Sequence, residues 1–341
     1  MGEIVLAAKI AHVPSILISE RPGPLHGKRA DAIRALKEIG ARAKARGADT
    51  FLIYDTHWIS NFGGHMNANA RHRGLYTSHE APHMIQNMAY DYRGDPELAD
   101  AIAAQSKTLG LEVLAHRVET LALEYGAIVP MHYMNDGWAR VLSVAAPIFA
   151  SVEENRGFGE ACARAIAASG RKVAVLASGS LSHKLVANDK VGDNQWGQVG
   201  SEFNRQVDLR VLDLWKERRY AEFVRMLPEY SAKCKGEGLM VDTHMIFGLL
   251  RNDEIVDVGA GLGGAYAEAG PGPFSRSLPM ALLRALNGQN EIDVTRAAAS
   301  NRRPFRAHLS GDRSADRRRK ARSSHARAGE IEADLAARLE I

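Results

Sequence analysis

Apolar residues in this chain fall into two patterns: short unbroken runs, and longer stretches with helical spacing. The unbroken runs, which predict buried strands, are EIVLAAKIA, TFLIYDTHW, LEVLAHRVE, VLSVAAPIFA and KVAVLASGS. Helical spacing is found in residues 27–47, in residues 157–169, and after Asp95, Pro96 and Glu97, which supply a capping side chain and a first-turn proline. Because strands and helices alternate, the sequence predicts an α/β fold, a layered single domain with a central, mostly parallel sheet flanked by helices.

The order of the elements adds detail to this prediction. A strand before His12, a helix, and a second strand ending at His57 predict a parallel pair joined by a crossover helix. Residues 60–94 show no sustained period, which predicts loops with short strands, and residues 126–134 predict a short turn or helix. Residues 197–227 predict a long amphipathic helical region, and GEGLMVDTHMIFGLL predicts a glycine-rich turn that enters a buried helix. Ligands in such folds gather at the C-terminal ends of the strands, where we expect the active site.

The last part of the chain has a different composition. From about residue 288 aromatic residues become rare, Arg and Ser increase, and runs such as RRRK occur. This predicts a folded domain over residues 1–287 and a basic, disordered tail over residues 288–341, with a short helix at 329–341. Residues 302–327 hold ten Lys or Arg and two Asp. The positive charge of this segment is larger than the net charge of the whole chain, which is +4. The rest of the chain therefore has a net negative charge and is mildly acidic.

Neither a membrane span nor a cleavable leader is predicted. The N-terminal apolar run is interrupted by Lys9 and His12, and no apolar stretch approaches the roughly 18 residues that a span requires. The two cysteines, Cys162 and Cys234, form no CxxC pair and no disulfide framework, which favours a reducing compartment. We therefore expect a cytoplasmic protein.

Three of the strand-like runs are followed by a histidine: His12 after AAKIA, His57 after FLIYDT and His183 after VLASGSLS. The C-terminal ends of parallel strands share one sheet edge, so these imidazoles are expected to face a common crevice. Two imidazoles and one carboxylate form the three-ligand set that suits non-haem iron(II) and leaves positions open. Taken singly, each histidine is more often a structural residue, and only together do the three favour a metal site. Neither HExxH nor a Cys/His zinc spacing is present.

A set of segments then identifies a family resemblance. AAKIAHVPS, YDTHW, YTSHEAPH, LEYGAIVPM, LASGSLSHKL, MLPEY and GEGLMVDT resemble the class III extradiol ring-cleavage dioxygenases, in order, from about residue 3 to residue 250. The resemblance implies an iron(II) enzyme that inserts both atoms of O2 into a catechol such as 3,4-dihydroxyphenylacetate. The ring would open beside the vicinal hydroxyls to give a semialdehyde. It also implies a homo-oligomer whose partners are the catecholic substrate and O2.

The same resemblance assigns roles to particular residues. His12 and His57 would bind the iron, and Glu237, within GEG, would be the third ligand, with Asp242 as the alternative. His183 would be the acid/base catalyst, a role for which imidazole is suited near neutral pH. Manganese in place of iron stays open.

Several further residues are weaker candidates. Tyr125 of LEYG could donate a hydrogen bond to bound substrate, or could simply pack in the core. Asp55 could orient a ligand histidine. His79, His83 and His116 could line the pocket or play structural parts.

Three alternative functions are considered. One is ring cleavage of 2-aminophenol or another catechol, and another is a metal-binding relative without oxygenase activity that uses zinc or no metal. The third is nucleic-acid binding through the basic tail, which the acidic body and the absence of a nucleic-acid module argue against. After Leu250 the resemblance fades into GAGLGGAYAEAGPGP, where the glycine-rich run is expected to be a flexible segment and not a nucleotide loop.

Overall fold

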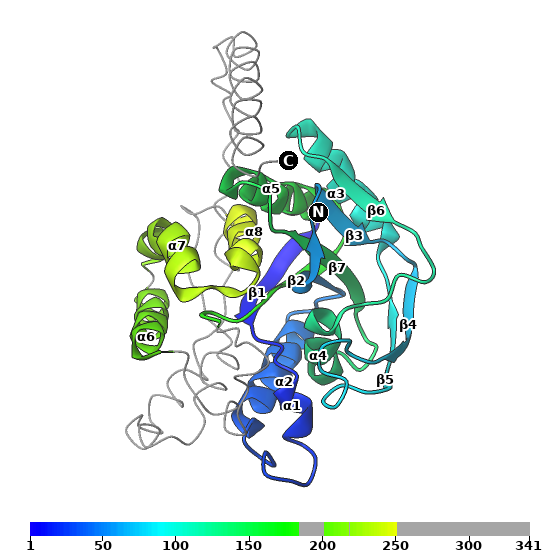
Figure 1. Cartoon of the computed structure of the whole chain (residues 1–341). Coiled ribbons are helices and arrows are strands. Elements are labelled where there is room, and N and C mark those ends of the chain that lie inside the picture. The colour runs from blue at the N-terminus through cyan, green and yellow to red at the C-terminus, as the bar shows by residue number, and fades with distance from the viewer. Residues whose placement is uncertain (184–200, 218, 251–341) are drawn as a thin grey trace, which may run out of the picture. The chain divides into compact units, whose positions relative to one another are not determined.

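A six-stranded sheet forms the centre of the computed structural model, which describes residues 1–183, 201–217 and 219–250 (Figure 1). The strands follow the order β1-β8-β2-β7-β3-β6. Their bounds are β1 (Glu3–Ile10), β2 (Thr50–Ser60), β3 (Gly64–Asn67), β6 (Val113–His116), β7 (Arg140–Pro147) and β8 (Lys172–Ser178). A separate antiparallel pair consists of β4 (Arg71–Tyr76) and β5 (Met88–Arg93).

The sheet is mostly parallel, as the sequence predicts. β1, β8, β2 and β7 run in one direction, β3 is antiparallel to β7, and β6 is parallel to β3. β1 and β2 are parallel, but β8 lies between them, so the predicted pair is not directly hydrogen-bonded. This insertion places β8 at the centre of the edge where the candidate site lies.

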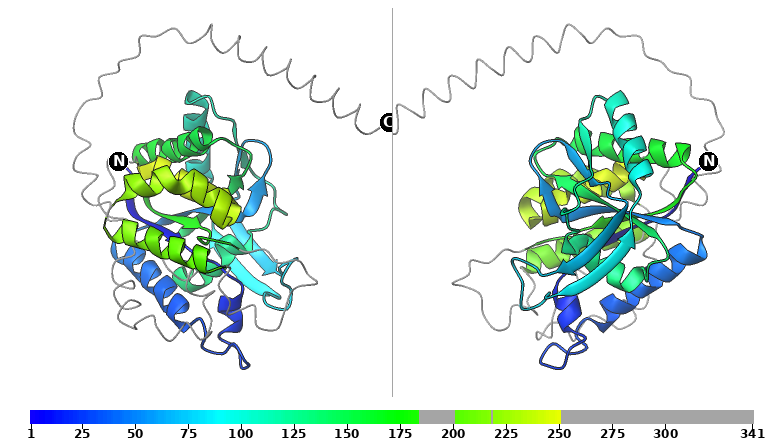
Figure 2. Two further views of the ribbon diagram at one scale, coloured as in Figure 1. Left: turned by 60° about the vertical axis from the view of Figure 1, so that its left-hand side comes forward. Right: turned by 90° about the vertical axis from the view of Figure 1, so that its right-hand side faces the viewer.

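Helices cover both faces of the sheet (Figures 1 and 2). The side chains of β2 alternate: Phe51 and Ile53 join one hydrophobic core, whereas Leu52 and Tyr54 join the other. The first core includes residues of α1 (Ser15–Ile18), α2 (Ala30–Ala45) and α4 (Tyr125–Met134). The second includes residues of α3 (Pro96–Thr108), α5 (Val152–Ala168), α6 (Glu202–Lys216), α7 (Tyr220–Cys234) and α8 (Val241–Leu250). The layered α/β prediction is confirmed.

Some element boundaries differ from the prediction, each for a local reason. α5 begins at Val152, before the predicted residue 157, because Ser151 and Glu154 form a reciprocal capping box. The helical region predicted over 197–227 consists, in its described part, of two helices, α6 and α7. β2 extends to Ser60, beyond the predicted end at His57. The proposed tail, residues 288–341, lies outside the described residues.

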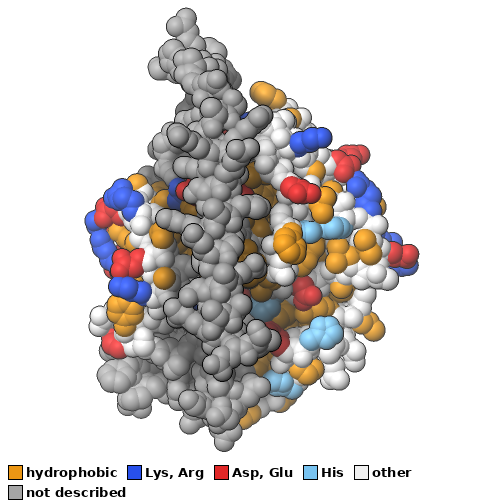
Figure 3. Space-filling view, turned by 45° about the horizontal axis from the view of Figure 1, so that its top comes forward, with side chains coloured by type: hydrophobic (Ala, Val, Ile, Leu, Met, Phe, Trp, Pro, Cys, Tyr) orange, Lys and Arg blue, Asp and Glu red, His pale blue; other side chains and the backbone are white. Residues whose placement is uncertain are grey.

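Charged side chains of both signs are interspersed on the described part of the face drawn in Figure 3. That distribution does not favour an extended nucleic-acid footprint there, which would be a patch of one sign. Among the helices in the described ranges, none combines the length and apolar character that crossing a bilayer requires.

Helices α5 and α8 approach closely through two glycines. A Cβ added at Gly159 would lie 1.9 Å from the Met245 carbonyl oxygen, and one added at Gly248 would lie 2.1 Å from the Arg156 carbonyl oxygen. These contacts are to backbone, which cannot rotate away. The two helices therefore depend on glycine at both positions to bring α8, and the turn before it, onto the sheet.

We expect Gly159→Ala to lower the free energy of unfolding by about 1–3 kcal/mol or more, because the methyl group would force the helices apart. Urea denaturation measures this loss. Gly170→Ala is the matched control, since a Cβ there meets no atom within 4 Å, and it should change stability by less than about 0.5 kcal/mol. Equal stability of the two variants would contradict the packing argument.

Candidate metal centre

The C-terminal ends of three adjacent strands form the candidate site. Ser178 at the end of β8 is paired in register with Ile10 of β1 on one side and Asp55 of β2 on the other. Two residues beyond these three positions stand His12, Ser180 and His57. Because β1, β8 and β2 are parallel, the register brings these residues to the same edge of the sheet.

A bulge in β2 changes the direction of its side chains at this edge. Asp55 pairs with Ala145 and Ile59 pairs with Ala146, so residues 56–58 have no counterpart on β7. The Asp55 carboxylate accepts a hydrogen bond from the His57 backbone N–H at 2.8 Å, which stabilises the bulge. Asp55 therefore contacts the predicted ligand histidine through the backbone of His57. Burial raises the pKa of Asp55 to about 6, although the charge of His12 acts in the opposite direction.

Glu237 enters the site from a strained turn between α7 and α8. It begins a 3₁₀ helix, η3 (Glu237–Met240), in which Gly238, Leu239 and Met240 all have positive φ angles. Left-handed conformations at non-glycine residues cost of order 1–3 kcal/mol each and concentrate at functional sites. Gly238 must also be a glycine for steric reasons, because a Cβ there would lie 2.8 Å from the Thr56 methyl group.

Both oxygens of the Glu237 carboxylate are held by neighbouring groups. Thr56 Oγ1 lies 2.9 Å from Oε1 and shares its proton between this oxygen and the Ser178 carbonyl oxygen, also at 2.9 Å. His12 Nε2 lies 2.9 Å from Oε1 as well. The backbone N–H of Ser180 donates to Oε2 at 2.5 Å, and the Ser180 hydroxyl donates to Oε2 as well. In a regular strand Thr56 and His57 would face opposite sides, but the bulge lets both reach this carboxylate, with His57 Nε2 at 3.5 Å from Oε1.

Electrostatics favour the ionised carboxylate. Burial would raise the pKa of Glu237, but the charge and hydrogen bond of His12, together with the charges of His183 and His57, hold it well below its usual range. Burial lowers the pKa of His12, yet the charge of Glu237 and its hydrogen bond outweigh burial, so the net shift is upward. Burial and the charge of His12 lower the pKa of His57 to about 3, which keeps its imidazole neutral.

This cluster is suited to a divalent cation. His12, His57 and Glu237 each offer one ligand atom, and the three atoms lie within 4.8 Å of one another. Two imidazole nitrogens and one carboxylate oxygen form the facial set used by non-haem iron(II) enzymes. A neutral imidazole and an ionised carboxylate are the forms that bind metal. His57 and Glu237 are shifted toward these forms, and a metal would replace the proton that His12 shares with Glu237. The donor set therefore fits a metal that keeps open positions.

Tyr125, at the start of α4, lies beside His57. Its hydroxyl is 2.5 Å from His57 Nε2 and also contacts the Glu80 carboxylate, and the two rings have centroids 3.7 Å apart. Burial and the hydrogen bond to Glu80 raise the pKa of Tyr125 well above its usual range, so the phenol stays protonated. Glu80 is not among the residues predicted from sequence, although it lies within the YTSHEAPH segment.

His183 lies next to Glu237 and Ser180. Its backbone N–H donates to the carbonyl oxygens of Cys234 and Lys235, and its Nδ1 is 3.4 Å from Ser180 Oγ. The turn after α7 thus positions both His183 and Glu237. Thr56, Ser178 and Ser180 are further site residues that sequence reasoning missed.

The alternative third ligand, Asp242, is engaged elsewhere. Its carboxylate is fully buried and forms a 2.6 Å ion pair with Lys9, whose side chain is also buried. The cluster of potential ligand atoms contains Glu237 and not Asp242. Among the weaker candidates, His116 stacks on His65 with ring centroids 4.9 Å apart, and His79 and His83 are exposed on the loop that carries Glu80.

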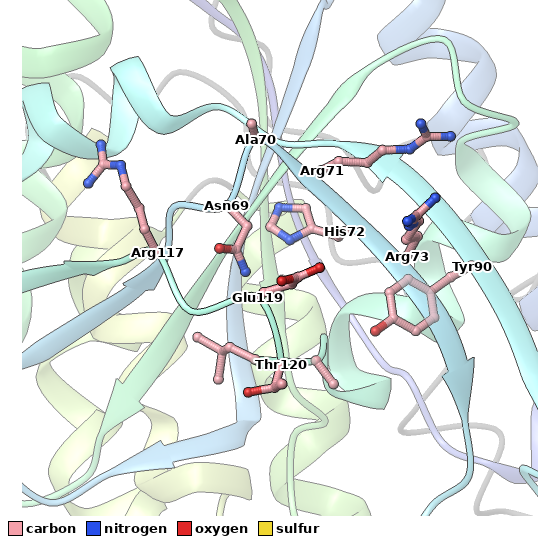
Figure 4. A pocket seen from close by; sticks show the side chains of 11 residues that line it. Asn69, Ala70, Arg71, His72, Arg73, Tyr90, Arg117, Glu119 and Thr120 are labelled. Atoms are coloured by element: carbon pink, nitrogen blue, oxygen red, sulfur yellow. The ribbon is translucent and has the colours of Figure 1, made fainter.

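A hollow of about 620 Å³ lies on another part of the surface (Figure 4). It is bordered by residues 69–73, Tyr90, Arg117 and residues 119–122, and contains none of the clustered ligand residues. Two arginines at its border are already paired, Arg71 with Asp91 at 2.5 Å and Arg117 with Asp100 at 2.6 Å. The hollow is thus separate from the candidate metal centre.

Comparison with known proteins identifies the family. The family model described as the catalytic LigB subunit of aromatic ring-opening dioxygenase matches residues 6–263. The chain belongs to this family, and it is an extradiol ring-cleaving dioxygenase, as the sequence resemblance predicts. The match continues past Leu250, where the recognisable segments end.

The curated relatives refine the comparison. The chain is 44% identical over 273 residues to 3,4-dihydroxyphenylacetate 2,3-dioxygenase from Escherichia coli, an alignment that covers 79% of this chain and 98% of the relative. It is 26% identical over 254 residues to the 2-aminophenol 1,6-dioxygenase beta subunit from a Pseudomonas species, covering 69% and 82%. The alpha subunit of that enzyme is 23% identical over 223 residues, covering 63% and 79%.

The buried Lys9–Asp242 pair leads to a stability prediction. We expect Lys9→Met to lower the free energy of unfolding by about 3–5 kcal/mol, because it removes the cation that pairs with the buried Asp242 carboxylate. The double variant Lys9→Met/Asp242→Asn should regain most of that loss, since the amide oxygen can still accept from the Thr243 backbone N–H. Urea denaturation of both variants checks this, and a double variant as unstable as the single one would contradict it.

Proposed function

We propose that this chain is an iron(II)-dependent extradiol dioxygenase that acts on 3,4-dihydroxyphenylacetate. The observation that carries the proposal is the convergence of two imidazoles and one carboxylate at a sheet edge in a member of the ring-opening dioxygenase family. The substrate is taken from the relative that is 44% identical and aligned over 98% of its own length. The partners of the chain would then be this catechol and O2.

His12, His57 and Glu237 would hold the metal. Bound iron(II) would supply a centre that takes the catechol oxygens and O2 together and passes electrons between them. Glu237 is suited to this role because Thr56 and Ser180 fix both of its oxygens. Metal analysis of the purified protein distinguishes iron from manganese, and zinc at full occupancy without oxygen uptake would contradict the proposal.

His183 would transfer protons to and from the substrate. The Ser180 hydroxyl has a single proton, which it donates to Glu237, so it can only accept a hydrogen bond from Nδ1–H of His183. In the neutral ring this arrangement places the lone pair on Nε2, which would take a proton from a catechol hydroxyl.

Tyr125 would orient substrate beside His57. Its raised pKa keeps a hydroxyl proton at neutral pH, and the exposed Glu80 carboxylate that accepts it can move aside when a substrate oxygen arrives. The hydroxyl can then donate to that oxygen. Tyr125 therefore acts as a hydrogen-bond donor and not as a base.

We also propose a cytoplasmic homo-oligomer whose catalytic domain covers residues 1–287, with residues 288–341 as a basic tail. Cys162 and Cys234 are buried free thiols, which is consistent with a reducing compartment. A chain that ends at residue 287 should retain ring cleavage. Loss of activity on truncation would move the domain boundary, and nucleic-acid binding that depends on the tail would support the alternative function.

The substrate proposal is tested by incubating the iron(II)-loaded protein with 3,4-dihydroxyphenylacetate or with 2-aminophenol. We expect oxygen uptake and a yellow ring-opened semialdehyde from the catechol, at a higher kcat/KM than for 2-aminophenol. A preference for 2-aminophenol would reassign the substrate. Absence of oxygen uptake with every catechol would overturn the proposed activity.

Metal retention tests the ligand assignment. We expect His12→Ala, His57→Ala and Glu237→Ala each to lose bound iron, because three protein ligands are the full set. Iron per chain is measured by atomic emission after gel filtration. His26→Ala is the control, because His26 is exposed and contacts the Arg21 carbonyl oxygen, and it should retain iron. Wild-type iron content in any of the three ligand variants would remove that residue from the set.

The acid/base role of His183 predicts a different result. We expect His183→Ala to keep its iron and to lose roughly 10²- to 10⁴-fold in kcat, because proton transfer and not metal binding is removed. Steady-state kinetics and iron content are measured on the same preparation. A normal turnover rate would refute the role.

A further inference from the structure

Ser178 is a fully buried residue that the proposed mechanism does not use. It ends β8 and is hydrogen-bonded in register between β1 and β2. Its hydroxyl oxygen lies 2.6 Å from the Gly126 carbonyl oxygen and 2.9 Å from Nδ1 of His12. These two contacts connect the backbone of α4 to a proposed metal ligand.

Counting protons decides the direction of both hydrogen bonds. A serine hydroxyl has one proton to donate, and a backbone carbonyl can only accept. The Ser178 proton must therefore go to Gly126, and the Ser178 oxygen must accept a hydrogen bond from His12. Nδ1 of His12 carries a proton, so Nε2, 2.9 Å from the Glu237 carboxylate, is the nitrogen that remains for a metal.

We infer that Ser178 is a positioning residue that fixes the tautomer of His12 and directs its Nε2 lone pair into the metal centre. The inference rests on the proposed function in one respect, that His12 is a metal ligand. The hydrogen bond from Nδ1 of His12 to Ser178 is the same whether Nε2 shares a proton with Glu237 or binds a metal. The hydrogen bond also fixes the rotation of the ring, as partners of metal-bound histidines commonly do.

The Gly126 carbonyl group, which accepts the Ser178 proton, cannot move easily. A Cβ at Gly126 would lie 1.9 Å from the Asp55 carboxylate, so the backbone of α4 is in close contact with β2 there. His12 is only 2% exposed and Ser178 is fully buried, so water has little access to replace the hydroxyl. Tyr125 precedes Gly126, which means that the same backbone segment positions the phenol beside His57 and the carbonyl beneath Ser178.

Metal affinity without substrate provides the test. We expect Ser178→Ala to bind zinc(II) about 10- to 100-fold more weakly than the wild type, the usual cost of losing a partner of a ligand histidine. Competition with a chromophoric chelator measures the affinity. Ser178→Thr, which keeps the hydroxyl, should recover most of it. Ser143→Ala is the matched control: Ser143 is 1% exposed on β7, a strand of the same sheet, and its hydroxyl has no hydrogen-bond partner in the described structure.

A second measurement reports the tautomer directly. In zinc-loaded wild-type protein with ¹⁵N-labelled histidine, long-range ¹H–¹⁵N spectra should show His12 protonated at Nδ1 and metal-bound through Nε2. This remains decisive if Ser178→Ala fails to fold. Metal binding through Nδ1, or equal zinc affinity of Ser178→Ala and wild type, would overturn the inference and leave the proposed activity standing. A wild-type chain that binds no metal would overturn both.

Discussion

The buried carboxylate of Glu237 is the constraint on which the site depends. A carboxylate removed from water is stable only if its lone pairs and charge are matched, and here Thr56, Ser180 and His12 do so from three different strands or strand ends. The protein thus brings β1, β2 and β8 into one arrangement around a single anion. The same requirement explains why the turn that carries Glu237 tolerates left-handed residues, since the contacts made by the side chain compensate for the strained backbone.

A second buried carboxylate, that of Asp242, is also stabilised by a charged partner. Lys9 and Asp242 form a second buried ion pair, and the glycines between α5 and α8 allow close packing of α8, which carries Asp242. Burial makes each pair costly to break and leaves few alternative partners. Site and scaffold are therefore stabilised together, and the chemistry at the sheet edge depends on helix packing some distance away.

The sequence predicts the fold class and brings His12 and His57 to one sheet edge, because unbroken apolar runs and the order of elements are local signals. Glu237 could be proposed only from family resemblance, since no periodicity identifies a carboxylate in a loop. The position of β8 between β1 and β2 could not be predicted, because strand order depends on contacts between distant segments. For the same reason Ser178 gave no signal: its importance lies in a partner on α4, far away in the chain.

The bulge at residues 56–58 has a consequence for comparing relatives. It allows two consecutive residues, a hydroxyl donor and an imidazole, to serve the same carboxylate, which a regular pleat forbids. Ligand geometry at this edge is therefore encoded in the length of a strand as much as in residue type. A homologue with one residue fewer between the positions of Asp55 and Ile59 would turn the histidine that corresponds to His57 toward the opposite face of the sheet. An alignment gap at this position therefore carries functional information that percentage identity does not show.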